Sequence, residues 1–387
     1  MTTLTNEILT SWANDPAAPV ALHLKQKLTS VECISEDDRC IIYPPTYADI
    51  GYNIDPVDGK KVALVDSVGS QANRMEPIFK STSEEREDWL VPQIQIALGK
   101  DTKEAKATRL SLLDLAHRGA DAVVQSSGQL AKDIRAAFAK LRATGDAAPL
   151  CAIAPTSLLF GVWDSRGGSS EKRPRLIRSV IRAWDVEVLH AAAQFNSVWK
   201  ELDEKQRKEL QDEAKKQKKK LSVKGFNDAP AIFRDTKAAQ YVGGLPNPDA
   251  RVLGGVLVKG GIERTVTINL VALRGLQCSD EKETKPLRTY LLSLALIAAT
   301  AEMDLFLREG CHLRYTGDDK WFSVPRRGKI EEVNLAAKEA AEAFNGAAEE
   351  GAKHFRSKWP KEMNYVFDVA EAKKLLAAKE EEEQAPE

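Results

Sequence analysis

Polar and apolar residues alternate sharply between Leu176 and Trp184, and this alternation predicts a strand with two different faces. The first face is small and mostly apolar and carries Ile177, Ser179, Ile181 and Ala183. The second face mixes cations with apolar side chains and carries Leu176, Arg178, Val180, Arg182 and Trp184. Because unpaired charges are costly to bury, we expect the first face to pack on a core and the second to lie outside it.

A basic turn precedes this strand. The cations around the Gly- and Ser-rich residues 167–170 are Arg166, Lys172, Arg173 and Arg175. Before the turn, the apolar run Leu158–Val162 predicts a buried strand. A face of Arg and Trp beside a basic loop is typical of single-stranded RNA binding, since cations bind phosphates and planar groups stack on bases. A solvated outer face with salt bridges explains the same pattern, and the stretch alone favours neither interpretation.

A second candidate binding site lies where the predicted strand Lys61–Asp66 runs into a helix. Ser67 or Ser70 is placed to cap this helix, whose free backbone N–H groups suit a phosphate. Three side chains of the first turns would reinforce the site: Gln71, Asn73 and Arg74. An ordinary capped helix without a ligand is the alternative, and the stretch alone favours that alternative.

Further strands are predicted at Val20–Leu28, whose outer face is basic, and at Val256–Val258 and Ile262–Leu270, which Gly260-Gly261 would join as a hairpin. The clearest predicted helix is Thr289–Leu307. Because strands and helices do not follow a regular βαβ rhythm, we expect an α+β fold with an antiparallel sheet. We predict a single domain over residues 1–374 with a helical insertion at about 195–250, followed by an acidic disordered tail over residues 375–387.

Composition and the absence of common motifs limit the classes of protein to which this chain can belong. A formal net charge of -1 argues against a protein that coats nucleic acid by bulk charge, but it allows a localised basic surface. Five scattered cysteines without a CxxC pair predict reduced thiols in a cytoplasmic protein, and we expect neither a signal peptide nor a membrane span. The histidines lack metal-binding spacing, and no P-loop or GxSxG motif occurs. We therefore expect a binding protein, not an enzyme, that uses no metal or cofactor.

Several motifs, in order, resemble one family. They are PPTYA at Pro44–Ala48, DSVGSQANRMEP at Asp66–Pro77, DLAHRGADA at Asp114–Ala122, APTSLLFGVWDSRG at Ala154–Gly167, RPRLIRSVIRAWDV at Arg173–Val186 and LSVKGFNDAPA at Leu221–Ala231. Together they resemble the backbone subunit of CRISPR-associated Cascade complexes, in the type I-G (formerly I-U) variant of the RAMP superfamily. The resemblance implies an RNA-recognition-type, ferredoxin-like palm with inserted helical finger and thumb elements.

The resemblance also implies a role. Such subunits polymerise head-to-tail along a CRISPR RNA and present its spacer for pairing with target DNA in antiviral defence, so that base pairing supplies the specificity. Other implied partners are the large and handle-binding Cascade subunits and a recruited helicase-nuclease. The expected RNA contacts are Ser67, Ser70, Gln71, Asn73, Arg74, Arg118, Arg166, Lys172, Arg173, Arg175, Arg178, Arg182, Trp184, Lys216, Lys219, Lys224 and Phe226.

Two other functions remain open. Similar backbone subunits of type III complexes cleave target RNA with a loop aspartate, and Asp164 is the candidate here, although it would equally fix a turn. A metabolic enzyme with a basic substrate pocket is the third possibility, and it predicts a discrete oligomer that is free of nucleic acid.

Overall fold

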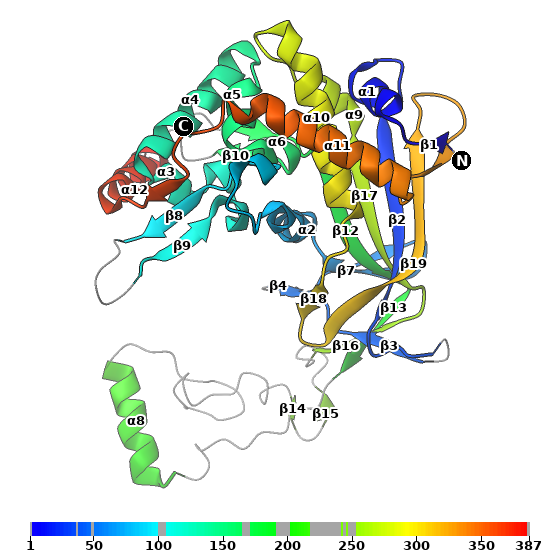
Figure 1. Ribbon diagram of the computed structural model, residues 1–387. Coiled ribbons are helices and arrows are strands. Elements are labelled where there is room, and N and C mark those ends of the chain that lie inside the picture. Colours follow the sequence, from blue (N-terminus) through cyan, green and yellow to red (C-terminus); the bar gives the residue numbers. More distant parts are fainter. Residues whose placement is uncertain are drawn as a thin grey trace.

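A large twisted sheet forms the centre of the molecule (Figure 1). The computed structural model describes residues 2–35, 38–47, 50–99, 106–164, 171–190, 202–216, 241–242, 245–246 and 253–384. Within these residues the sheet has nine strands in the order β1-β20-β19-β2-β17-β12-β7-β6, with β18 paired to β19. Every pair in it is antiparallel except β1 with β20. The expected α+β class with an antiparallel sheet is confirmed.

The strands of this sheet have the following bounds. They are β1 (Thr2–Thr3), β2 (Ala21–Ser30), β6 (Ile54–Val57), β7 (Lys60–Asp66), β12 (Ile177–Trp184), β17 (Ile262–Asn269), β18 (Leu305–Arg308), β19 (Cys311–Val324) and β20 (Glu331–Asn334). Smaller sheets join β3 (Cys40–Ile42), β13 (Val186–His190) and β16 (Leu253–Val258), and β8 (Gln95–Leu98), β9 (Thr108–Ser111) and β21 (Asn364–Val366). Two-stranded pairs are β4 (Thr46–Tyr47) with β5 (Gly51–Tyr52), β10 (Val162–Asp164) with β11 (Glu171–Arg173), and β14 (Tyr241–Val242) with β15 (Leu245–Pro246).

Helices cover one face of the sheet (Figure 1). The longer ones are α1 (Asn6–Asn14), α4 (Gly128–Thr144), α10 (Glu281–Thr300) and α11 (Lys338–Arg356), and the shorter ones are α2 (Val68–Met75), α3 (Ala122–Gln125), α5 (Ala148–Ile153), α6 (Pro155–Leu159) and α9 (Leu270–Arg274). Short 3-10 turns include η1 (Glu76–Phe79) and η4 (Arg118–Ala120). Side chains of α10 such as Leu291 pack with Leu22, Leu24 and Ile177 of the sheet in the main core. None of the described helices has an apolar run long enough to cross a bilayer.

The two predicted faces of β12 are present. Ile177, Ser179, Ile181 and Ala183 are buried. On the other face Arg178 and Trp184 are exposed and Arg182 is half-buried, whereas Leu176 and Val180 are buried. The alternation therefore placed the cations correctly, although the outer face is less open than the pattern predicted.

The predicted hairpin across Gly260-Gly261 is wrong, because β16 and β17 pair with other strands. β17 pairs with β12 and β2, while β16 pairs with β13 and β3. The four strands instead form one long antiparallel ribbon, β12–β13 against β16–β17, which turns from the large sheet into the small one. The turn occurs at Asp185 (φ 52°) and Gly261 (φ 88°), where Gly260 N–H donates to the carbonyl of Trp184 at 2.9 Å. The chain between residues 190 and 253 leaves and returns at the end of this ribbon.

Three other predictions need correction. Leu158 and Leu159 belong to helix α6, because Pro155 starts a helical turn there, and only Val162 of the predicted run lies in a strand. The predicted helix Thr289–Leu307 begins earlier and ends at Thr300, and Leu305 starts β18. Helix α12 (Val369–Gln384) includes Glu380–Glu383, so the predicted disordered tail is helical up to Gln384.

A buried arginine ties the sheet to its helical cover. Arg264 of β17 is 0% exposed, and its Nε donates to Gln71 Oε1 of α2 at 3.2 Å and to Ser179 Oγ of β12 at 3.1 Å. Its Nη1 donates to Gln26 Oε1 of β2 and to the carbonyl of Ala299 in α10. Burial lowers the pKa of Arg264, but a guanidinium starts so high that it keeps its charge.

We predict that Arg264→Met lowers the free energy of unfolding by about 3 kcal/mol, because methionine keeps much of the volume but leaves buried acceptors without donors. Chemical denaturation of the pure protein measures the change. Arg178→Met is the matched control, since Arg178 is an exposed cation on the neighbouring strand and its loss should change stability by less than about 0.5 kcal/mol. Equal losses in the two variants would contradict a structural role for Arg264.

Candidate nucleic-acid interface

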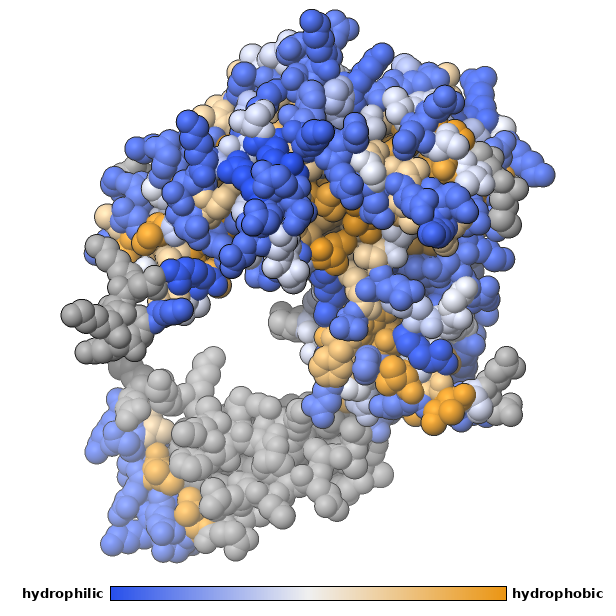
Figure 2. Space-filling view, viewed as in Figure 1, coloured by the Kyte–Doolittle hydropathy of each residue, from blue (hydrophilic) through white to orange (hydrophobic). Residues whose placement is uncertain are grey.

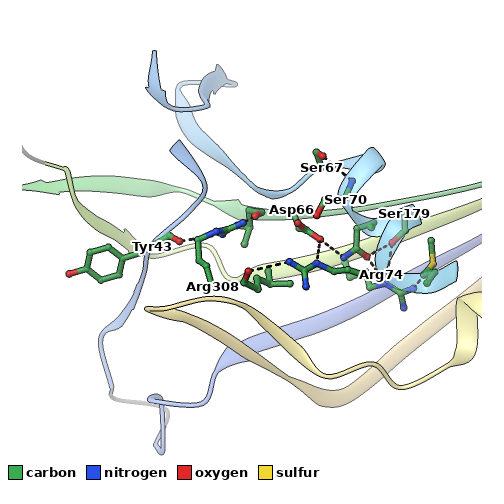
Figure 3. Close-up of polar contacts among 12 residues, drawn as sticks. Tyr43, Asp66, Ser67, Ser70, Arg74, Ser179 and Arg308 are labelled. Atoms are coloured by element: carbon green, nitrogen blue, oxygen red, sulfur yellow. Dashed lines mark hydrogen bonds and ion pairs between the residues drawn. The ribbon is translucent and has the colours of Figure 1, made fainter. Parts of the chain in front are cut away.

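Helix α2 follows β7 directly and begins with the predicted cap. Ser67 is the N-cap, and its Oγ accepts from the backbone N–H of Ser70 at 3.2 Å (Figure 3). Both serines are half-buried, and the helix begins at the rim of the sheet, beside β12. The first turn therefore lies at the protein surface, with part of its backbone N–H groups bonded by the cap.

Two of the predicted RNA contacts on α2, Gln71 and Arg74, form hydrogen bonds to other residues of the protein. Gln71 is 0% exposed and donates from Nε2 to Asp66 Oδ2 at 2.7 Å, while its Oε1 accepts from Ser179 and Arg264. The Nε of Arg74 pairs with the same Asp66 oxygen at 3.2 Å, and its Nη2 donates to the carbonyl of Leu307 in β18 (Figure 3). The structure corrects the prediction for Gln71, which is not available to a ligand. Arg74 keeps 30% of its side chain exposed.

Arg118 is also internal, which corrects its prediction as an RNA contact. It is 4% exposed and has a left-handed backbone (φ 54°), and its Nε lies 2.7 Å from Glu76 Oε2. Its Nη1 donates to the carbonyl of Gly161, its Nη2 donates to Asn73 Oδ1, and the guanidinium lies over the ring of Phe160. Arg118 therefore holds α2, η1 and the start of β10 together beneath the surface.

The remaining predicted residues on this side form a surface that we call the α2 surface, defined by Ser67, Ser70, Asn73 and Arg175. Asn73 and Arg175 are exposed. Burial is the main reason why the pKa of Arg118 is lowered, and the nearby charge of Arg175 lowers it further. Lys172 of β11 is exposed and continues the surface along the chain. Arg173 is half-buried, and its Nη2 donates to the carbonyl of Leu141 at 3.4 Å, so part of this predicted RNA contact is used inside the protein. In Figure 2 the coloured part of the molecule is concave below the region where α2 lies in Figure 1.

Arg178, Arg182 and Trp184 lie on the opposite face of β12 from α2. The strand register places Arg178 and Arg182 across from Thr267 and Glu263 of β17, which in turn pair with His23 and Lys27 of β2. We call this side the open face, defined by Arg178, Arg182, Lys25, Lys27 and Lys320. Acidic side chains offset part of its charge, since Lys27 Nζ lies 2.6 Å from Asp318 Oδ2.

Lys25, Lys27 and Lys320 were not among the predicted contacts. The alternation of Val20–Leu28 already placed Lys25 and Lys27 on an outer face, and knowledge of the strand order was needed to bring them beside Arg178 and Arg182. Lys320 reaches this face because β19 continues as one strand past a bulge between Tyr315 and Asp319 and pairs Lys320 with Lys25.

The other predicted contacts fall elsewhere. Lys216 ends helix α8 (Glu204–Lys216), is largely exposed and lies 3.7 Å from Glu213. Arg166, Lys219, Lys224 and Phe226 lie outside the described residues. Among the residues that the structure describes, no three His, Cys, Asp or Glu side chains are grouped so that they could hold a metal ion.

Comparison with known proteins gives one family match. Residues 23–188 match the model of a family described as CRISPR-associated protein GSU0053, and this stretch includes α2, η4 and β10–β12. The match supports a CRISPR-associated protein. No curated protein matches the chain.

A solved structure described as "CRISPR RNA-guided surveillance complex, pre-nicking" contains a similar chain at 11% sequence identity, which covers 92% of this chain and 100% of that one. Its TM-score is 0.29, so we draw neither fold nor function from it.

The Glu76–Arg118 pair predicts a pH effect on stability. Burial raises the pKa of Glu76 to about 7 from an ordinary value near 4.5, against the opposing charge of Arg118. The folded protein then holds this proton more tightly than the unfolded chain, so the stabilisation is complete below pH 4.5 and is lost as pH rises through 7. Between pH 5 and 7.5, we expect the stability of the wild type relative to Glu76→Gln to fall by on the order of 2 kcal/mol.

Denaturation midpoints of both proteins across this pH range measure the effect. Glu187→Gln is the matched control, because a hydrogen bond from Lys259 lowers the pKa of Glu187 and its stabilisation should not change in this range. A flat difference between the wild type and Glu76→Gln would show that Glu76 is ionised in the folded protein throughout.

Proposed function

We propose that this chain is a backbone subunit of a CRISPR effector complex, of the type I-G Cascade kind, that binds CRISPR RNA along its α2 surface. The observation that carries the proposal is that separate sequence motifs come together in the fold. Motifs that are far apart in the sequence, around residues 67–74, 114–122 and 173–175, meet at α2, where exposed Asn73 and Arg175 lie over the buried Arg118. The family match covers all three motifs.

The chemistry of the α2 surface suits an RNA backbone. Arg175 and Lys172 offer cations, Asn73 offers an amide, and the start of α2 offers the positive end of a helix dipole. None of these groups is arranged in a closed pocket that would select one base. Such a surface grips phosphates and sugars and leaves the bases free to pair, as RNA-guided recognition requires.

In this proposal the sheet and its helical cover form an RNA-recognition-type palm, and copies of the chain assemble head-to-tail along the guide. A head-to-tail interface is heterologous and does not have to close, so it permits a filament. Target DNA would reach the complex by pairing with the guide, and the other Cascade subunits and the helicase-nuclease would join the assembled filament.

We predict that the chain co-expressed with a CRISPR RNA purifies as a ribonucleoprotein with a high ratio of absorbance at 260 to 280 nm. Asn73→Asp combined with Arg175→Glu should abolish the RNA, because both changes add negative charge at the α2 surface. The aspartate keeps the acceptor that Arg118 uses, so the fold should survive. RNA-free wild-type protein that forms a discrete oligomer would contradict the proposal.

The sequence pattern also predicts RNA contacts at Arg178 and Arg182, which lie across the sheet from the α2 surface, so Arg178→Glu with Arg182→Glu tests whether the open face binds RNA as well. Both side chains lie away from the core, so we expect a normally folded protein that binds RNA more weakly than the wild type, with a salt dependence of log Kd reduced by about 1.4 if both arginines contact phosphates. Lys338→Glu with Lys353→Glu makes the same charge change on α11 and should leave binding unchanged. Loss of folding in the open-face variant would mean that this face is structural.

We further propose that the subunit does not cleave RNA. Incubation of the assembled complex with matching RNA and Mg²⁺ should leave the RNA intact, and Asp164→Ala should behave as the wild type. Cleavage at regular intervals that Asp164→Ala abolishes would instead establish the RNA-cleaving alternative.

A further inference from the structure

The β10–β11 pair exposes a tryptophan that the proposed function does not yet use. Trp163 is 62% exposed, more than any other tryptophan among the described residues, and Trp12, Trp321 and Trp359 are at most 7% exposed. Its neighbour Val162 is buried at 6%, so β10 is anchored on one side and presents the indole on the other. An exposed indole offers a broad flat face on which a planar ligand can stack.

A cation faces this ring across the ladder. Trp163 is directly opposite Lys172 of β11, and directly opposed residues of an antiparallel pair project from the same side. Lys172 is exposed as well. The pair therefore offers a flat aromatic surface and an ammonium group within reach of one ligand.

The pair lies beside the α2 surface. Gly161, two residues before Trp163, accepts from Arg118, and a side chain at Gly161 would meet Cγ of Arg175 at 2.8 Å. Two residues of strand span about 7 Å, so Trp163 lies roughly that far along β10 from the point where Arg175 packs. A nucleic-acid strand whose phosphate binds Arg175 would thus have a base within reach of the indole.

We propose that Trp163 stacks on an unpaired base of a single-stranded nucleic acid, while Lys172 contacts the adjoining phosphate. The proposal rests on the proposed function, which supplies the RNA. Stacking accepts every base because each has a flat π-face, so this site adds affinity without adding sequence preference. It also fixes one base at a set position relative to the phosphates at the α2 surface.

Two substitutions at Trp163 distinguish stacking on an aromatic ring from a contact that needs only apolar area. Trp163→Phe keeps a ring and should bind fluorescein-labelled single-stranded RNA within about threefold of the wild type. Trp163→Leu keeps apolar area without a ring and should bind roughly 5- to 150-fold more weakly. Both variants should keep the thermal midpoint of the wild type, since the side chain is exposed. Phe306→Leu is the matched control, because Phe306 is 58% exposed on β18 and its loss should not change affinity.

Fluorescence supplies a direct readout. RNA should quench the tryptophan emission of the wild type, and most of this quenching should be absent in Trp163→Phe. Wild-type affinity in Trp163→Leu, or full quenching in Trp163→Phe, would overturn the stacking role while leaving the proposed function intact. Failure of the wild type to bind RNA at all would overturn the proposed function and the stacking role together. If Trp163→Leu binds RNA normally but disrupts self-association, Trp163 contacts a neighbouring copy and the proposal is wrong.

Discussion

The buried guanidinium of Arg264 is the interaction on which the arrangement of the sheet and α2 depends. It bonds side chains from α2, β12 and β2 and a carbonyl of α10, so one residue fixes the helix over the sheet. Gln71 also donates to Asp66, and Asp66 accepts from Arg74 (Figure 3). Arg74 in turn donates to the carbonyl of Leu307 in β18. A buried charge with several neutral acceptors tolerates little displacement, because any shift leaves a polar group unsatisfied. The α2 surface therefore rests on a rigid base.

Sequence patterns predicted β2 and β12 well because one face of each strand is mostly buried, and this burial imposes a period of two on the sequence. β7 was predicted instead from its continuous apolar run, which is buried on both faces. The patterns failed where pairing partners decide the structure. Gly260-Gly261 is a typical hairpin signal, yet here it marks a corner between two sheets, and only the register of β13 with β16 distinguishes the two. Leu158–Val162 is too short for its period to separate a helical turn from a strand.

The site was harder to predict than the fold. Motif order and charge predicted residues that the fold brings together at α2, but Gln71 and Arg118 are buried, since polar residues in a motif serve either a ligand or the scaffold and the sequence does not distinguish them. β12 carried a second ambiguity. Its odd and even positions serve different sides of the sheet, so Ser179 bonds Gln71 of α2, whereas its neighbour Arg178 lies on the open face.

The bent ribbon has a consequence for how such a chain can change. β13 and β16 pair out to His190 and Leu253, so the backbone ladder itself holds together the two points between which residues 191–252 run. Closure entropy grows only slowly with the length of a connection whose ends are already fixed. A segment inserted there can be lengthened, shortened or exchanged without moving β12 or β17, which carries Arg264. The paired ends of the ribbon thus allow the inserted segment to vary while the strands of the large sheet stay in place.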